Sequence, residues 1–451
     1  MIQKSQLAQL GLFDAKVPRY TSYPTAPHFN TDLGAETYSN WIGEIMPGSS
    51  ISLYIHVPFC RRLCWFCACR TQGTQSDAPV LAYLETLRSE LALLRDRLPD
   101  GVKLSRLHWG GGTPTLLSPS MMTDLAGSIA SITPLAENAE FSVEIDPNEI
   151  DEARLDALAK AGLTRASIGV QDFDPEIQQA IGRIQSYELT RDAVDMIRAR
   201  GIASVNTDIL FGLPHQTRAR MTESVQKLLS LNPDRVALYG YAHVPWIARR
   251  QTMIPSAALP TPEERLELYE TARKLFLWDG YAEIGIDHFA TADDGLTKAR
   301  DAGRMRRNFQ GYTDDSSDVL IGVGASSISR FPQGYAQNAP ATSAHTKAIR
   351  DGRFSTSRGH EFSGSDKMRA RLIESLMCEF RIDRAEIADR FGPQASQLDS
   401  LFDEADRAFP DILSITDNGL FIPPDARSLT RMIARSFDAY DVNAHGHSSA
   451  I

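Results

Sequence analysis

The sequence predicts an α/β fold: a partial (β/α)6 barrel, preceded by an N-terminal arm and followed by a small, mainly helical C-terminal domain. Short apolar runs alternate with helical patterns over residues 51–245, an order typical of βα units around a parallel sheet. Six such units fit there, whereas a closed barrel of this kind needs eight. After about residue 361 the pattern changes to helices and turns. We therefore divide the chain into an N-terminal arm (1–50), a barrel domain (51–360) and a C-terminal domain (361–451).

The individual strands and helices follow from apolar periodicity. Residues 51–57 (ISLYIHV) are rich in β-branched and aromatic residues and predict a buried strand. Leucines recur at spacings of three and four from Leu84 to Leu98, which predicts a helix with one apolar face. Further strands are expected at 104–109, 141–145, 166–170, 205–210 and 236–241, with helices at 151–161, 187–199 and 221–231.

The two ends of the chain depart from this alternation. Residues 18–29 (PRYTSYPTAPHF) show neither a helical nor a strand period, and we interpret them as an ordered arm. In the C-terminal domain, helices are expected at 367–378, 385–391 and 429–437, with a turn at the Asp-Asn-Gly sequence 417–419. Residues 443–450 are polar, and we expect them to be frayed.

Composition excludes several classes of protein. With 42% hydrophobic and 23% charged residues, the chain resembles ordinary globular proteins and not disordered ones. The 47 basic and 57 acidic residues give a net charge of −10, which disfavours sequence-independent nucleic-acid binding. No apolar run approaches the length of a membrane span, and the first residues lack the apolar core of a secretory signal. We expect a cytoplasmic protein without a nucleic-acid or membrane partner.

Four of the five cysteines lie in one short segment, CRRLCWFCAC, which we call the cysteine loop (residues 60–69). An odd number of cysteines, this few in so long a chain, argues against a disulfide framework. Structural zinc usually takes a second pair of ligands, and Cys378 stands alone. Thiolates this close on a loop suit an iron–sulfur cluster. The spacing C-x3-C-x2-C over Cys60, Cys64 and Cys67 is that of radical S-adenosylmethionine (SAM) enzymes, in which three thiolates hold a [4Fe–4S] cluster and SAM occupies the fourth iron. A structural metal site, with zinc in this loop, or a set of buried thiols is the alternative.

Polar or glycine-rich residues follow the expected strands, where reactive groups of (β/α) barrels gather. The triplet Gly110–Gly112 follows the second strand, and glycine lets a backbone approach a ligand closely. Glu144 ends the third strand and could bind a ribose, with an ion pair as the alternative. Tyr54 and His56, two residues apart, share one face of the first strand.

Together, these motifs resemble the oxygen-independent coproporphyrinogen III oxidases (coproporphyrinogen dehydrogenases) of the radical SAM superfamily. The resemblance covers nearly the whole chain. The arm and Cys69 are its most discriminating parts, since related haem-binding chaperones generally lack the arm and often differ at this cysteine. The matching segments are PRYTSYPTA (18–26), YIHVPFCRRLCWFCAC (54–69), HWGGGTPT (108–115), SVEIDP (142–147), GVQDF (169–173), DILFGLPHQT (208–217), GIDHFA (285–290), NFQGYT (308–313), YAQN (335–338), LMCEF (376–380) and FDAY (437–440).

The resemblance implies a set of site residues. Cys60, Cys64 and Cys67 would bind the [4Fe–4S] cluster, while Cys69 and Tyr54 would be catalytic without binding the metal. Positions that match SAM-binding residues of the family are Tyr54, Phe66, Gly111, Gly112, Thr113, Glu144, Gln171, Arg183 and Asp208. Ala242 and Ile328 match positions that line the cofactor region, where a second SAM is one alternative.

The resemblance also implies an activity. The family converts two propionates of coproporphyrinogen III to vinyl groups without dioxygen, giving protoporphyrinogen IX in haem biosynthesis. Reductive cleavage of SAM, with electrons from a donor such as flavodoxin or ferredoxin, starts this chemistry, and the cofactor carries the hard step. We expect a monomer. The competing interpretation is a haem-binding chaperone built on the same scaffold.

The sequence departs from the family pattern at three positions. Ala68 stands where glycine is usual, Gly182 where asparagine is common, and Asp314 where a second threonine is usual. The substrate carries four carboxylates, so cationic side chains should contact it through charge-assisted hydrogen bonds. Candidates are Arg19, Arg61 and Arg62, and the alternative for each is a solvated surface arginine.

Overall fold

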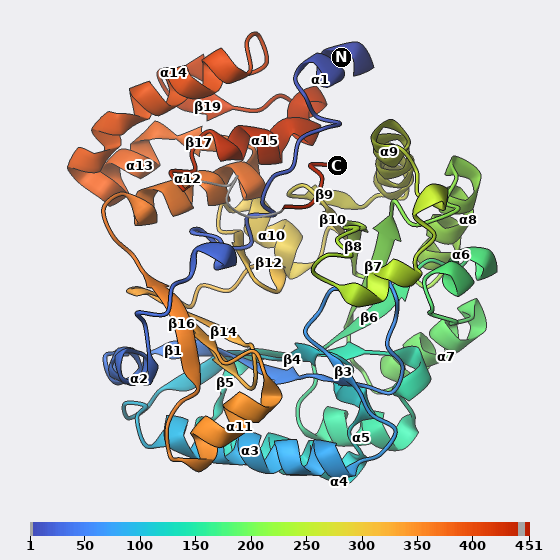
Figure 1. The fold of residues 1–451 in the computed structure, drawn as a ribbon, viewed down its shortest axis with the longest axis vertical. Helices are drawn as coiled ribbons and strands as arrows, with labels where there is room; N and C mark the ends of the chain where they lie inside the picture. Colours follow the sequence, from blue (N-terminus) through green and yellow to red (C-terminus); the bar gives the residue numbers. More distant parts are fainter. Residues whose placement is uncertain (1–2, 441–446) are drawn as a thin grey trace.

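A single twelve-stranded sheet forms the body of the protein in the computed structural model, which describes residues 3–440 and 447–451. Its centre is a run of parallel strands that lie side by side in chain order, which confirms the six predicted strands (Figure 1). These strands are β1 (Ser50–Val57), β4 (Lys103–Gly111), β5 (Leu135–Ile145), β6 (Arg165–Gln171), β7 (Ser204–Phe211) and β8 (Arg235–Gly240).

Further strands extend both edges of this parallel run. On one side β13 (Leu320–Val323) pairs with β1 in parallel, and three antiparallel strands continue the sheet. On the other side β10 (His288–Ala290) and β9 (Ala282–Ile284) pair antiparallel with β8 and with each other. The outer strands β16 and β9 do not pair, so the sheet curls into an open barrel. The strands beyond residue 245, with β14 (Ile328–Phe331), β15 (Gly334–Asn338) and β16 (Thr356–Glu361), were missed in the sequence because most of them are only three to five residues long.

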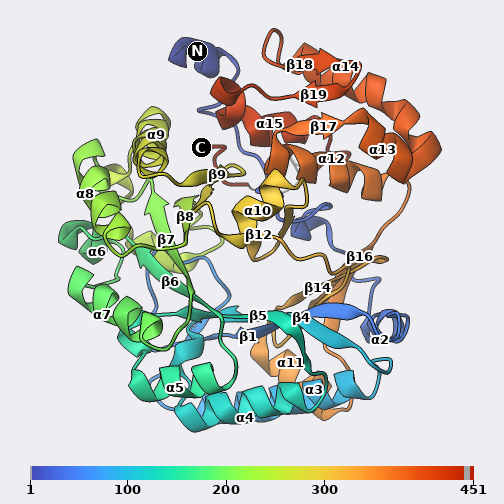
Figure 2. The same ribbon diagram turned by 180° about the vertical axis from the view of Figure 1, so that it is seen from behind.

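Helices cover the outside of the sheet (Figures 1 and 2). In α3 (Ala78–Arg95) the side chains of Leu84, Leu87, Leu91 and Leu94 are buried, as the leucine spacing predicts. None of the described helices is long and apolar enough to cross a membrane. The other covering helices are α4 (Pro119–Ala130), α5 (Glu152–Lys160), α7 (Tyr187–Arg198), α8 (Arg218–Leu229), α9 (Pro262–Trp278) and α11 (Thr342–Arg350).

A buried ion network fills the barrel near the amino ends of its strands. The side chain of Glu140 on β5 is 2.8 Å from Arg106 on β4 and 3.4 Å from Arg165 on β6. Burial favours the neutral acid, but these arginines outweigh it and lower the pKa of Glu140 to about 2. Arg235, at the start of β8, donates to Asp294 at 2.7 Å. This end of the barrel is filled, so a ligand has room only at the carboxyl ends of the strands.

The C-terminal domain combines helices with a small sheet. Its helices are α12 (Asp366–Glu379), α13 (Arg384–Phe391), α14 (Leu398–Ala408) and α15 (Thr430–Arg435), of which α14 was not predicted. The Asp-Asn-Gly turn was predicted correctly, since it joins β18 (Ser414–Thr416) to β19 (Gly419–Phe421). The strand β17 (Arg381–Asp383) completes a three-stranded sheet in the order β17-β19-β18.

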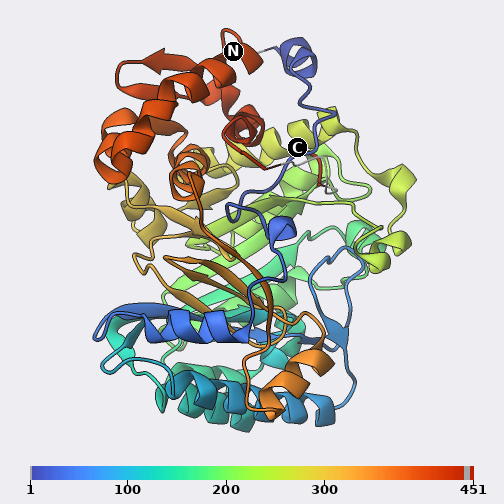
Figure 3. The same cartoon turned by 60° about the vertical axis from the view of Figure 1, so that its left-hand side comes forward.

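The N-terminal arm runs from the C-terminal domain to the barrel (Figure 3). Its side chains contribute to two separate cores. After α1 (Lys4–Gln9), the side chains of Leu12, Phe13 and Tyr20 pack among the helices of the C-terminal domain. Farther along, α2 (Ala35–Gly43) packs against the barrel core. The first fifty residues thus join the C-terminal domain to the barrel.

The prediction of a frayed C-terminal tail is wrong for the part that the structure describes. Residues 443–446 lie outside the described residues, but 447–451 run along the arm. The Val17 N–H donates to the carbonyl oxygen of Ser448 at 3.2 Å, and the Ala450 N–H donates to that of Ala15 at 2.8 Å. Ala450 and Ile451 are buried. A polar sequence without a period predicts no hydrogen-bond partners for its backbone. In the structure the arm supplies these partners.

Candidate active site

The cysteine loop leaves the carboxyl end of β1 and is closed at its base. There β2 (Phe59–Cys60) pairs with β3 (Gln72–Gly73), and the Gln72 N–H donates to the carbonyl oxygen of Pro58 at 2.8 Å. Cys60 is buried, Cys64 and Cys67 are half-buried, and Cys69 is exposed. None of the five cysteines forms a disulfide. The loop therefore presents free thiols at the open end of the barrel.

Of the three thiols assigned to the cluster, Cys67 has the surroundings that most favour the thiolate, which is the form that binds a metal. The Cys67 sulfur accepts hydrogen bonds from the Cys69 side chain and from the Cys69 N–H at 3.4 Å. These bonds, with the nearby charges of Arg250 and Arg183, outweigh burial and lower the pKa of the Cys67 thiol. Burial raises the pKa of Cys60 to about 11, and a bound metal would reverse that shift by stabilising the thiolate.

The donor set fits an iron–sulfur cluster better than a zinc ion. Within residues 3–440 and 447–451, no group of three or more His, Cys, Asp or Glu side chains is placed to hold one metal ion. Cys60, Cys64 and Cys67 nevertheless share one short loop, and Arg183 places a guanidinium nitrogen 3.6 Å from the Cys64 sulfur. Three thiols spread around a loop can surround a cluster of several irons, and a cationic neighbour offsets its negative charge.

The glycine triplet lies directly against the cysteine loop. A Cβ atom on Gly112 would lie 2.4 Å from the carbonyl oxygen of Phe59, and one on Gly111 would lie 2.6 Å from the His56 ring. The Gly112 N–H donates to the carbonyl oxygen of Val57 at 2.8 Å. Next in the chain, the Thr113 N–H donates to that of Phe59, also at 2.8 Å. Only glycine permits this approach, so the triplet has a packing role in addition to any contact with a ligand.

Tyr54 contacts two histidines, His56 and His108, and His108 in turn lies beside Glu144. The Tyr54 hydroxyl is hydrogen bonded to Nδ1 of His56 at 2.9 Å, and the Tyr54 ring stacks on His108 with centroids 5.7 Å apart. His108 Nε2 lies 3.5 Å from Glu144 Oε1, and Gly111 N–H donates to Glu144 Oε2 at 2.9 Å. Burial raises the pKa of Glu144, but His108 and Gly111 reverse the effect and hold it below its usual range. Glu144 is therefore a carboxylate at neutral pH.

Gln171 ends β6, Asp208 lies on β7, and Arg183 lies in the loop after α6 (Pro175–Ala180). Gln171 has a backbone φ of 69°, a conformation that is unfavourable for residues other than glycine and clusters at functional sites. Arg183 donates to the carbonyl oxygen of Gly169 at 2.9 Å, on the same strand as Gln171. Burial raises the pKa of Asp208 to about 6, although Asn206 donates a hydrogen bond to it at 2.9 Å.

Phe66 and Ala242 are joined by a residue that the sequence did not single out. The buried Gln251 side chain donates to the carbonyl oxygen of Phe66 at 2.7 Å and to that of Ala242 at 3.0 Å. Gln251 therefore fixes the cysteine loop to the segment after β8. Ile328 begins β14, and the loop before it contacts His56 through the Ser326 hydroxyl at 3.5 Å.

A cavity of about 640 Å³ opens beside the cysteine loop. Its size falls in the range of small-molecule binding sites. The lining includes Cys67, Ala68, Cys69, Arg250 and Ser326. The exposed Cys69 thus faces a space large enough for a ligand.

Comparison with known proteins agrees with this arrangement. Residues 54–228 match the model of the radical SAM superfamily. An oxygen-independent coproporphyrinogen III oxidase of Paracoccus denitrificans is 66% identical over 451 residues, 100% of both chains. One from Cereibacter sphaeroides is 61% identical over 98% of both chains. A solved coproporphyrinogen III oxidase from Escherichia coli, described as a radical SAM enzyme, matches with a TM-score of 0.88 and 33% identity, covering 94% of this chain and 100% of that one.

The chain belongs to the oxygen-independent coproporphyrinogen III oxidase family. As a radical SAM protein it uses a [4Fe–4S] cluster and SAM. The alternative of a haem-binding chaperone finds no support in these comparisons.

Two of the departures from the family pattern have a structural reason. Gly182 has a φ of 66°, and a Cβ atom there would lie 2.8 Å from the Trp65 ring, so an asparagine would require this ring to shift. Asp314 accepts a hydrogen bond from Arg106 at 2.6 Å and joins the ion network inside the barrel. Ala68 is exposed on the wall of the cavity, and nothing in the structure explains the choice of alanine there.

The three arginines proposed for the substrate have different surroundings. Arg61 is paired with Asp77 and is therefore engaged within the chain. Arg62 is exposed. Arg19 donates to the carbonyl oxygen of Gly240, at the end of β8, at 2.7 Å. Of the three, and among the described residues, Arg19 alone is hydrogen bonded to a strand end at the mouth of the barrel.

Sequence reasoning missed a second polar group at the barrel mouth. His288 on β10 is 3.3 Å from the Tyr239 hydroxyl and 2.7 Å from Asp287, and Tyr239 lies beside Asp208. The segment GIDHFA (285–290) contains two of these residues, and its match to the family was the available signal. No local period marks this segment, because β10 has only three residues.

Proposed function

We propose that this chain catalyses the oxygen-independent oxidative decarboxylation of coproporphyrinogen III in haem biosynthesis. Two propionate side chains become vinyl groups, and the product is protoporphyrinogen IX. The observation that carries this function is the 66% identity over the full length of the Paracoccus denitrificans enzyme. The free thiols at the open end of the barrel support it.

We assign the metal-binding role to Cys60, Cys64 and Cys67, since their loop offers three thiols beside Arg183. When bound, the cluster and SAM supply the one-electron chemistry that removes a hydrogen atom from a propionate β-carbon. We assign SAM binding to residues of the cysteine loop itself, of the neighbouring strands and of the loops that follow them. They are Tyr54, Phe66, Gly111, Gly112, Thr113, Glu144, Gln171, Arg183 and Asp208.

The chain's own residues bind and orient the reactants. The Glu144 carboxylate can accept hydrogen bonds from ribose hydroxyl groups, while its link to Gly111 fixes its position. Tyr54 keeps its proton, because burial raises its pKa well above the usual value. Cys69 lines the cavity and donates to Cys67, so we assign it a role near the substrate and not in metal binding.

Each decarboxylation removes one hydrogen atom, one molecule of carbon dioxide and one electron from a propionate. When bound, SAM would supply the group that takes up the hydrogen atom, and a small donor protein such as a flavodoxin or ferredoxin would supply the electron for its cleavage. The electron lost with the carbon dioxide would pass to a separate one-electron acceptor. We further propose that the protein acts as a cytoplasmic monomer, since both large cores are completed within one chain. Ala242 and Ile328 border the cofactor region, and a second SAM there is tested by counting SAM bound per cluster.

The test is an anaerobic product assay on the reconstituted protein. Reduced protein with SAM and coproporphyrinogen III should release two molecules of carbon dioxide for each molecule of protoporphyrinogen IX. Cys64→Ala serves as the inactive control. Tight haem binding without any turnover would instead support the chaperone.

A further inference from the structure

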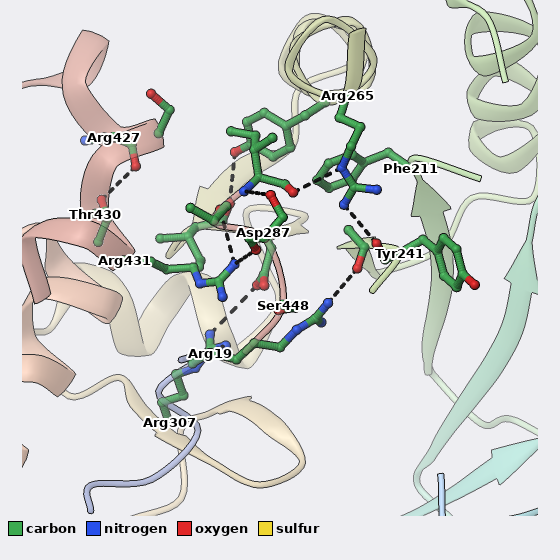
Figure 4. A pocket seen from close by; sticks show the side chains of 17 residues that line it. Arg19, Phe211, Tyr241, Arg265, Asp287, Arg307, Arg427, Thr430, Arg431 and Ser448 are labelled. Atoms are coloured by element: carbon green, nitrogen blue, oxygen red, sulfur yellow. Dashed lines mark hydrogen bonds and ion pairs between the residues drawn. The ribbon is translucent and has the colours of Figure 1, made fainter. Parts of the chain in front are cut away.

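A second cavity lies between the N-terminal arm, the end of β8 and the C-terminal domain (Figure 4). Its free volume is about 90 Å³, enough for a few water molecules or one carboxylate group and too small for a tetrapyrrole. Four arginines from separate elements surround it, and we call it the arginine cavity. They are Arg19 from the arm, Arg265 from α9, Arg307 from β11 (Arg306–Asn308) and Arg431 from α15.

The positive charge of this cavity is not balanced. Among the described residues that line it, Asp287 is the one acidic side chain. A fifth lining arginine, Arg427, is paired with Glu283. The hydrogen bonds of Arg19 and Arg431 go to main-chain carbonyl oxygens, which carry no net charge. Arg265 is left out of this balance, because it also donates to an oxygen of Ile451, the last residue of the sequence. Arg19, Arg307 and Arg431 thus share one acidic side chain in a chain whose net charge is −10.

The arginines also affect one another's protonation. Burial, with the charge of Arg19, lowers the pKa of Arg265 to about 10. Burial, with the charges of Arg19 and Arg307, lowers that of Arg431 to about 9. Both side chains remain charged at neutral pH, and each would be stabilised by an anion between them.

Arg307 has donors that nothing in the described chain accepts. Its side chain is 6% exposed, and neither Nε nor Nη1 has a hydrogen-bond partner. The nearest acidic oxygen is Oδ1 of Asp287, 3.9 Å from Nη1. The guanidinium group stacks on the Tyr312 ring, 4.5 Å from its centroid, which fixes its direction. Buried donors without partners are rare and costly, so these two nitrogens mark the place of an acceptor from outside the chain.

The arginine cavity adjoins the proposed active site. Phe211 lines it and ends β7, the strand that carries Asp208. On the other side, Asp287 is linked through His288 to Tyr239, which lies beside Asp208. A large ligand at the barrel mouth can therefore reach the cavity with one of its side chains.

We propose that the arginine cavity is a carboxylate-binding subsite that takes one propionate of the substrate, with Arg19 and Arg307 as the donors. Guanidinium groups suit this ligand, because they bind carboxylates through paired, charge-assisted hydrogen bonds. One anchored propionate would orient the ring while another lies at the cofactor. The identity of the ligand rests on the function proposed above, whereas anion binding by the cavity does not.

The test is binding of coproporphyrin III, the non-reacting oxidised tetracarboxylate, to the full-length protein by fluorescence titration. Arg19→Gln should raise the Kd about tenfold or more, and binding should depend less on salt than in the wild type. The arm stays attached in this variant, because Arg431 holds Pro18 and Tyr20 is bonded to Asp438. Arg353→Gln, an exposed arginine elsewhere, is the matched control.

A second variant separates ligand binding from a structural ion cluster. Asp287→Asn removes the one acidic side chain among the described lining residues and should bind coproporphyrin III at least as tightly as the wild type. If Arg19→Gln binds with the wild-type Kd, or if both variants weaken binding equally, the subsite is refuted. A wild-type protein that binds in this Arg19-dependent way yet forms no protoporphyrinogen IX would support the subsite and refute the proposed function. Normal turnover with unchanged KM in Arg19→Gln would support the proposed function and refute the subsite.

Discussion

Glu144 Oε2 accepts a hydrogen bond from the Gly111 N–H at 2.9 Å, so the end of β5 is fixed to the glycine triplet at the end of β4. Gly111 in turn lies against His56 on β1, and His56 is bonded to Tyr54. Three neighbouring strands are thereby held in one arrangement beside the cysteine loop.

This relationship predicts the effect of Glu144→Gln. The amide keeps one acceptor oxygen but loses the negative charge and replaces the other oxygen with a donor group. SAM affinity should fall about tenfold, corresponding to about 1.4 kcal/mol, while iron content stays at the wild-type level. Equilibrium binding of SAM checks this, with Glu137→Gln, exposed on the same strand, as the control. Unchanged SAM affinity would exclude Glu144 from the cofactor site.

The assignment of the cluster predicts that Cys64→Ala abolishes cluster binding. Removing one of three thiolate ligands leaves too few donors to hold the cube. Iron and sulfide analysis of the anaerobically reconstituted protein measures this directly. The control is Cys378→Ala, because Cys378 is buried in a separate hydrophobic cluster and should have no effect on iron. Wild-type iron content in Cys64→Ala would be incompatible with the assignment.

Cys69→Ser separates metal binding from activity. Cys69 is exposed in the cavity and donates to Cys67, so the serine variant should keep its iron but lose most of its decarboxylation activity. Iron content and product formation, measured on the same protein sample, test the retained cluster and the lost activity separately. A loss of iron as large as that in Cys64→Ala would make Cys69 a ligand.

The N-terminal arm supports two predictions that differ by the length of a deletion. Removing residues 1–30 takes Leu12, Phe13 and Tyr20 from the C-terminal core, but the barrel core contains no residue before Leu33. The truncated protein should therefore keep its cluster and SAM binding, lose porphyrinogen decarboxylation, and unfold at a lower temperature. A deletion of residues 1–9 keeps Arg19 and should retain activity. A full-length rate in the 1–30 deletion would show that the arm is not part of the site.

A buried pair outside the site predicts a pH dependence of stability. The Glu90 carboxyl group accepts from Gly324 N–H and Asn338, and its Oε2 lies 3.4 Å from His345 Nε2. Burial raises the pKa of Glu90 from 4.5 to about 8 and lowers that of His345 from 6.5 to about 4. In the native state both groups are therefore neutral near pH 6, where a protonated Glu90 can donate to His345.

The sign follows from the proton balance. Above pH 4.5 the unfolded chain releases a proton that native Glu90 keeps, so this group destabilises the fold increasingly up to pH 8. His345 has the opposite effect, because the unfolded chain binds a proton there that the native state does not. This makes the free energy of unfolding rise with pH, but only below pH 6.5. Between pH 6.5 and 8 the contribution of Glu90 to the free energy of unfolding should fall by about 2 kcal/mol, at up to about 1.4 kcal/mol per pH unit. Other groups, such as Cys67, titrate in the same range, so the measured quantity is the difference from Glu90→Gln. In denaturant unfolding the wild type and Glu85→Gln, exposed on the same helix, should lose this stability relative to Glu90→Gln as the pH rises.

The sequence and the structure agree most closely where the signal is local. The leucine spacing in α3 and the β-branched run in β1 depend on neighbours within a few residues, and both elements form where they were predicted. The very short strands β9 and β10 carry no such period, since three residues are too few to show one. The tail at 447–451 was misjudged because its partner, the arm, is more than 400 residues away in the chain.

By itself the sequence determined the six parallel strands, the cysteine spacing and the motifs that place the chain in its family. Each of these depends on residues that are close together in the chain, because local backbone geometry is enough to bring their side chains onto one face or one loop. The tertiary structure decided which arginines are available: Arg61 is paired with Asp77, while Arg19, Arg265, Arg307 and Arg431 converge on one cavity. Those four residues are separated by up to 412 positions, which is the difference between 431 and 19. Only the packing of the arm and the C-terminal domain against the barrel brings them together.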